Sequence, residues 1–191
     1  MNIAVPIKYV PDTETIVRIG ADRKSINPDG ITFVLNPYDE FALEESLKIR
    51  EASGGEVTLV TIGSDSAVKA LRTGMAMGAD KAIHVKCDDQ IDPSAAAKIL
   101  AGVLQDKGFD IIFTGMKAVD DDAGVVGPML AEFLGLPCIT MVTKLEVEGG
   151  KAFGYRESEA GAEKVEASLP AVFTAQKGLN EPRYASLKGI M

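Results

Sequence analysis

The sequence has few histidine and cysteine residues, two types that often carry catalysis or bind metals. It contains no tryptophan, one histidine and two cysteines in 191 residues. A single histidine, His84, disfavours a histidine-dependent nucleophile and a multi-histidine metal site. Cys87 and Cys138 lie far apart and outside any C-x-x-C pattern, so we interpret both as reduced thiols without a special role. We therefore predict no catalytic side chain and no resident metal.

Basic residues and long apolar runs are also scarce. The 20 Lys and Arg residues face 28 Asp and Glu residues, which gives a formal net charge of −8. This charge disfavours nucleic acids and anionic membranes as partners. No apolar run reaches the roughly 18 residues of a membrane span. Residues 1–5 already resemble a core strand, so we expect no signal or transit peptide. We expect a cytoplasmic, bacterial protein.

The common nucleotide-binding motifs are absent as well. There is neither a Walker P-loop nor a G-x-G-x-x-G run. Ser53-Gly54-Gly55 follows a helical pattern and precedes a strand pattern, so we interpret it as a helix C-cap. An ATP-hydrolysing or adenylating enzyme would need a pyrophosphate loop and a cation at the phosphates, and is therefore disfavoured.

Strand-like and helix-like segments alternate over the first 140 or so residues. Apolar runs, several of them apolar throughout, occur at residues 3–10, 31–35, 57–62, 82–85 and 111–114. Helix starts are indicated by an Asn-Pro-Tyr-Asp N-cap motif at residues 36–39, by Ser64 or Asp65, by Asp92-Pro93 and near Val125. The alternation predicts an α/β fold with a doubly wound, mostly parallel, Rossmann-like sheet.

The pattern changes after Pro137. Two extended segments around a Glu-Gly-Gly-Lys turn at residues 148–151 predict a β-hairpin. A charged connection, residues 157–166, then leads to one more strand near residues 169–174. We divide the chain into a nucleotide-binding domain, residues 1–178, and a recognition loop, residues 179–191.

Ligands of doubly wound sheets bind beyond the carboxyl ends of the strands, near the point where strand order reverses. Residues 115–127 leave a strand, pass through small residues and enter a helix. Free backbone N–H groups at that helix start would form an anion site, and Gly124 and Gly127 would allow close approach of a phosphate. The acidic triplet 120–122 within this loop has three open interpretations: a metal site, a contact to a ligand, or a solvated loop. Metal is the least favoured, because three adjacent residues cannot face one ion without a sharp turn.

Taken in order, these segments resemble the small (beta) subunit of the electron transfer flavoprotein family. The resemblance spans essentially the whole chain, and its most specific element is Asn-Glu-Pro-Arg-Tyr at residues 180–184. The other matching stretches are residues 8–12, 36–45, 75–80, 115–127, 155–157 and 169–175.

The resemblance implies an adenine nucleotide alpha hydrolase-like fold and a heterodimer. A large alpha subunit would hold the redox FAD, while this chain would bury a structural AMP. The complex would accept electrons from acyl-CoA-type flavin dehydrogenases in fatty acid oxidation and pass them to a quinone reductase. The implied nucleotide pocket comprises Pro6, Asn36, Asp39, Ile62, Gly63, Ala118, Asp121, Gly124, Val125, Val126 and Gly127.

One departure from the family pattern concerns the phosphate. Much of the family carries polar residues, including a threonine, where this chain has Gly124, Val125 and Val126. Backbone donors would then have to hold the phosphate. A second branch of the family binds another FAD in this pocket, but the acidic triplet and residues 36–39 look more like the AMP branch. A stand-alone ATP- or AMP-binding module is the remaining alternative.

The resemblance also implies partner contacts. Residues 180–187 align with a recognition loop whose exposed leucine anchors dehydrogenases, a role that falls to Leu187, with Tyr184 nearby. Glu157 would pair with an arginine of the alpha subunit, worth at most about 1 kcal/mol if exposed. Family members usually continue past this point as an arm around the large subunit, which we expect this chain to lack.

Overall fold

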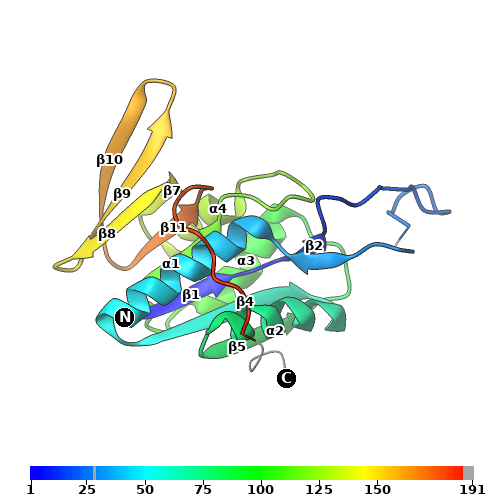
Figure 1. The fold of residues 1–191 in the computed structure, drawn as a ribbon, viewed down its shortest axis with the longest axis horizontal. Coiled ribbons are helices and arrows are strands. Elements are labelled where there is room, and N and C mark those ends of the chain that lie inside the picture. The colour runs from blue at the N-terminus through cyan, green and yellow to red at the C-terminus, as the bar shows by residue number, and fades with distance from the viewer. Residues whose placement is uncertain (28, 187–191) are drawn as a thin grey trace.

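The centre of the protein is one parallel β-sheet. The structure, a computed structural model, describes residues 1–27 and 29–186. Its six-stranded sheet has the order β5-β4-β1-β6-β11-β7, and all of its pairings are parallel (Figure 1). The strands are β1 (Asn2–Pro6), β4 (Glu56–Gly63), β5 (Lys81–Lys86), β6 (Ile111–Gly115), β7 (Cys138–Val142) and β11 (Ala171–Ala175). The predicted doubly wound, mostly parallel sheet is confirmed.

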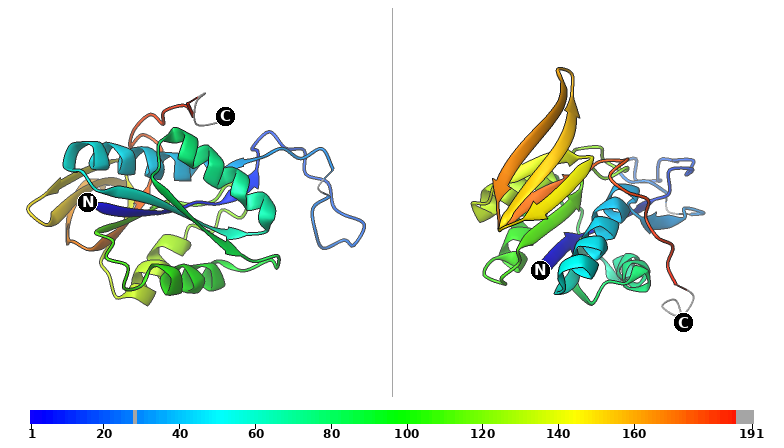
Figure 2. Two further views of the ribbon diagram at one scale, coloured as in Figure 1. Left: turned by 90° about the horizontal axis from the view of Figure 1, so that it is seen from below. Right: turned by 60° about the vertical axis from the view of Figure 1, so that its left-hand side comes forward.

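Helices cover both faces of this sheet (Figure 2). On one face lie α1 (Pro37–Ser53) and α2 (Val68–Met77), the latter preceded by a 3-10 turn, η1 (Asp65–Ala67); on the other lie α3 (Pro93–Leu104) and α4 (Val126–Leu134). Side chains alternate between the two cores along each strand: Phe113 packs with the α1 core and Ile112 with the α3–α4 core. Within the described ranges no helix combines the length and apolar character that a bilayer span requires.

The first apolar run is split in two. Residues 3–10 were expected as one strand, but β1 ends at Pro6, and β2 (Tyr9–Pro11) pairs instead with β3 (Phe33–Leu35). Between β2 and β3, the segment of residues 12–27 and 29–32 projects from the body (Figure 1). β7 was not expected, because Cys138–Val142 follows a proline directly and shows no period of its own.

The predicted hairpin is present and is larger than expected. β8 (Lys144–Glu148) and β9 (Lys151–Ser158) form it, and β10 (Gly161–Ser168) adds a third antiparallel strand. The interpretation of residues 157–166 as a connection was therefore wrong. Charged residues in this segment face opposite charges across the strands, and Arg156 and Glu163 are direct register partners with a Nε–Oε2 distance of 2.7 Å.

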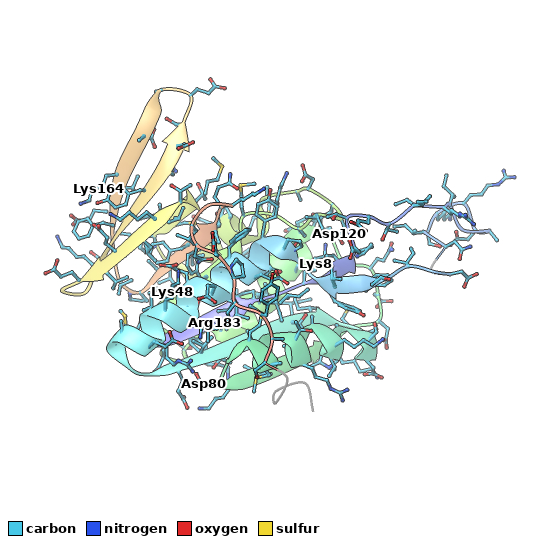
Figure 3. All side chains as sticks on the ribbon, in the orientation of Figure 1. Lys8, Lys48, Asp80, Asp120, Lys164 and Arg183 are labelled. Atoms are coloured by element: carbon cyan, nitrogen blue, oxygen red, sulfur yellow. The ribbon has the colours of Figure 1, made fainter. Side chains whose placement is uncertain are left out.

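The C-terminal strap, residues 176–186, crosses the outer face of α1 and reaches α2 (Figures 1 and 3). Arg183 donates to both carboxylate oxygens of Glu44, at 2.8 and 3.0 Å, and also pairs with Glu51. Asn180 Nδ2 donates to the Phe41 carbonyl and to Glu45. The backbone N–H of residue 186 donates to the Ala76 carbonyl on α2 at 2.9 Å. Glu44 is buried, with a side chain only 4% exposed. The strap therefore covers a carboxylate whose burial would be costly without the ion pair to Arg183.

Replacing Arg183 should destabilise the protein much more than removal of an exposed ion pair does. Arg183→Met leaves the Glu44 carboxylate buried and unpaired, at a cost of about 2–4 kcal/mol in the free energy of unfolding. Lys151→Met is the control, because its pair with Glu166 is about half exposed on both sides and should be worth under about 1 kcal/mol. Urea unfolding measures both. Equal effects of the two variants would contradict the anchoring role of Glu44.

Candidate functional site

A cleft opens beyond the carboxyl ends of β1, β4 and β6. The chain builds β1, β4 and β5 outward in one direction and then crosses through α3 to β6, on the other side of β1. The cleft thus lies at the topological switch point, where doubly wound folds bind their ligands. Its empty space, counted together with the open mouth, is ≈ 820 Å³.

Most of the residues expected in the pocket meet at this cleft. Those that line it are Pro6, Asn36, Asp39, Ile62, Ala118, Asp121, Gly124, Val125, Val126 and Gly127. Gly63 does not line the cleft. It is the last residue of β4, and its carbonyl oxygen faces β5, where it lies 2.9 Å from His84 Nε2 and accepts the Cys87 N–H.

Sequence reasoning missed the α3 side of the wall, which comprises residues 91–93, Ala96 and Leu100. It also missed Ile7, Val60 and Thr114 on the sheet side. The α3 side had a usable signal, because an Asp-Pro helix start that follows a parallel strand reaches the same sheet edge as the other ligand loops. Asp92 caps α3 by accepting the Ala95 N–H at 2.7 Å.

Asp39 joins two strand ends at the floor of the cleft. Its two carboxylate oxygens accept the backbone N–H groups of Lys8 at 2.8 Å and of Gly115 at 3.1 Å. A side chain at Gly115 would collide with this carboxylate, since a Cβ there would lie 2.4 Å from Asp39 Oδ1. Burial raises the pKa of Asp39 from its ordinary value of 3.8 to about 7, although these N–H donors favour the charged form.

Asn36 holds the loop after β6. It was predicted to cap α1 with its side chain, but it makes no such hydrogen bond. Instead its Nδ2 donates to the Lys117 carbonyl at 3.0 Å, and its Oδ1 accepts the Val119 N–H at 3.2 Å. The side-chain cap is lost because the amide, 1% exposed, has both of its polar groups engaged by this loop.

The lysines at the cleft are held by the acidic triplet. Lys8 Nζ lies 2.8 Å from Asp120 (Figure 3). It also lies 3.0 Å from Asp121, and Lys117 pairs with Asp122. Burial lowers the pKa of Lys8, but hydrogen bonds and attraction from the two aspartates outweigh that effect and raise it. Lys8 and Lys117 therefore already have counter-charges, and the triplet serves as their partner.

The cleft ends at the first turn of α4. In the described part of the chain, the backbone N–H groups of residues 124–127 have no partner, and Pro128 has no N–H to offer. Gly124 has a φ of +65°, which favours glycine. At Gly127 a Cβ would lie 2.5 Å from Thr174 Cγ2 and 2.8 Å from Thr114 Oγ1, so only glycine fits. Four neutral backbone donors thus lie at one end of the cleft.

Two of the expected partner-binding residues, Glu157 and Tyr184, lie apart from the cleft. Glu157 is exposed on β9, and Tyr184 is 97% exposed on the C-terminal strap. Leu187 lies outside the described residues.

Comparison with known proteins identifies the family. A family model for the electron transfer flavoprotein domain matches residues 25–191. The chain belongs to the electron transfer flavoprotein family. It is 43% identical to the electron transfer flavoprotein subunit beta of Bacillus subtilis, covering all of this chain and 75% of that protein. It is 40% identical to the mitochondrial beta subunit of Arabidopsis thaliana, covering all of this chain and 77% of that protein. The resemblance to the beta subunit is confirmed.

The elevated pKa of Asp39 predicts a pH-dependent stability. The folded state binds this proton more tightly than the unfolded state does, so ionisation between about pH 4 and pH 7 lowers the free energy of unfolding. Relative to Asp39→Asn, the free energy of unfolding of the ligand-free protein should fall by about 2–3 kcal/mol between pH 5 and pH 8, because each pKa unit corresponds to about 1.4 kcal/mol. Urea unfolding at both pH values measures this. Asp88→Asn controls for removal of an exposed charge, and a pH-independent difference for Asp39→Asn would refute the prediction.

Proposed function

We propose that this protein is the beta subunit of a heterodimeric electron transfer flavoprotein, that it binds AMP in the cleft as a structural ligand, and that it has no catalytic side chain. The proposal rests on one observation: at the switch-point cleft of a member of this family, four N–H donors have no partner among the described residues. AMP offers a phosphate for these donors and an adenosine for the apolar wall.

The residues of the cleft fit such a nucleotide. The N–H groups at the start of α4 would hold the phosphate without a cationic side chain. Pro6, Ile62 and Ala118 supply apolar surface for the nucleoside. AMP has no redox chemistry, so its contribution would be to fill the cleft and satisfy the backbone donors around it. Gly63, which does not line the cleft, stays a prediction only from the family pattern.

Electron transfer would depend on FAD, held mainly by the alpha subunit. That flavin supplies the redox chemistry of the complex, and this chain supplies surfaces for partners. The C-terminal strap leads into Leu187, the residue proposed to anchor acyl-CoA-type dehydrogenases in a fatty acid oxidation system that delivers electrons to a quinone reductase. Glu157, exposed on β9, would pair with an arginine of the alpha subunit. We place the complex in the bacterial cytoplasm.

Mass spectrometry of ligand released from the denatured protein tests the nucleotide directly. One equivalent of AMP supports the proposal. FAD would indicate a second flavin in this cleft, and ATP turnover by the purified chain would indicate a stand-alone nucleotide enzyme; either result would overturn it.

Asn36→Ala should weaken AMP binding about tenfold, because the 117–119 loop loses both side-chain hydrogen bonds that fix it beside the cleft. Titration calorimetry on nucleotide-free protein measures the change. Asn27→Ala is the matched control, since Asn27 also accepts a local N–H but does not line the cleft. Unchanged AMP affinity in Asn36→Ala would show that the loop does not depend on this amide.

Leu187→Ala should slow electron delivery from a dehydrogenase to the reconstituted heterodimer, with KM for the dehydrogenase raised about tenfold or more, because an apolar anchor is removed from the docking contact. AMP content and thermal stability should not change. Glu181→Ala, an exposed position on the strap, is the control. Equal rates for the Leu187→Ala protein and the unmodified protein would rule out the anchor role.

A further inference from the structure

Thr114 is an unusual buried residue. It is 5% exposed, and in the described part of the chain its Oγ1 has no hydrogen-bond partner. Two other buried threonines of the central sheet are satisfied: Thr61 donates to the Ile7 carbonyl at 2.8 Å, and Thr174 accepts the Met141 N–H at 2.9 Å. A buried hydroxyl without a partner is costly, so native proteins keep one where something else completes its hydrogen bond.

The fold places this hydroxyl under the first turn of α4. Thr114 lies two residues after Ile112 on β6, so its side chain points to the same face, toward α3 and α4. It is also a lining residue of the cleft, near the carboxyl end of its strand. Because position 127 is a glycine whose Cβ would lie 2.8 Å from Thr114 Oγ1, no side chain separates the hydroxyl from the helix start.

The missing partner should be an acceptor that carries negative charge. The neighbouring free groups, the N–H donors of residues 124–127, all require an acceptor. The lysines of the cleft, Lys8 and Lys117, are engaged with the acidic triplet. An oxyanion with several acceptor oxygens and no protons to donate would satisfy the hydroxyl and the amides together.

We infer that the Thr114 hydroxyl donates a hydrogen bond to the phosphoryl group of the nucleotide and belongs to the anion site of this chain. The inference rests on the proposed binding of AMP and names a side-chain ligand for its phosphate. Thr114 thereby supplies a hydroxyl that the side chains at residues 124–126 do not provide. The site selects a phosphate monoester over the free nucleoside through neutral donors.

Titration calorimetry with AMP and with adenosine, on nucleotide-free protein, tests the inference. Thr114→Val keeps the shape of the side chain and removes the hydroxyl. We expect its Kd for AMP to rise about tenfold or more, and its Kd for adenosine to change less than about twofold. Thr114→Ser, which keeps the hydroxyl, should bind AMP within about threefold of the unmodified protein.

Thr58→Val is the matched control, since Thr58 is also a buried strand threonine but lies outside the cleft lining. If Thr114→Val does not fold, the pair Thr114→Ser and Thr114→Ala isolates the hydroxyl in a smaller side chain and should show the same AMP-specific loss. If the variants with and without the hydroxyl bind AMP equally well, the role of Thr114 is overturned but the anion site is not. An unmodified protein that binds AMP no better than adenosine overturns the proposed anion site itself.

Discussion

The candidate site depends on two buried polar side chains at the start of α1. Asp39 binds the backbone N–H groups that follow β1 and end β6, and Asn36 binds the loop that continues from β6. These strands are neighbours at the switch point, where no connecting helix fixes their ends to each other. The first turn of α1 therefore sets the width of the cleft, and burial of the Asp39 carboxylate is the cost of that arrangement.

The electrostatics of the cleft follow from this construction. The acidic triplet holds Lys8 and Lys117 at the rim, so their charge is largely compensated before any ligand arrives. At the start of α4 remain donors that have no partner within residues 1–27 and 29–186, and Gly127 there allows the helix to approach Thr114 and Thr174 closely. Neutral, preorganised donors can bind a phosphate tightly enough for a structural ligand, and the net charge of −8 is then no obstacle to an anionic nucleotide.

Apolar runs and helix starts such as Asp92-Pro93 are local signals, and they were sufficient for the parallel sheet. Most of the cleft residues followed instead from the resemblance to the family. Local signals failed where a partner distant in sequence decides the outcome. The Asn36 amide looks like a helix cap until residues 117–119 are brought beside it. The charged residues of β10 look like a loop until β9 supplies the opposite charges. In the sequence, Thr114 is indistinguishable from any other strand residue. Only the tertiary fold shows that its hydroxyl has no partner among the described residues.

The same helix also connects the cleft to the C-terminal strap. α1 presents Asn36 and Asp39 to the cleft at its first turn, and it presents Glu44 and Glu51 to Arg183 farther along. Between them Leu43 and Leu47 are fully buried, so the helix cannot shift without opening the core. A nucleotide that completes the donors around the first turn would stabilise this helix, and with it the base on which the strap rests. A ligand without redox chemistry can in this way support the surface proposed to meet the redox partners.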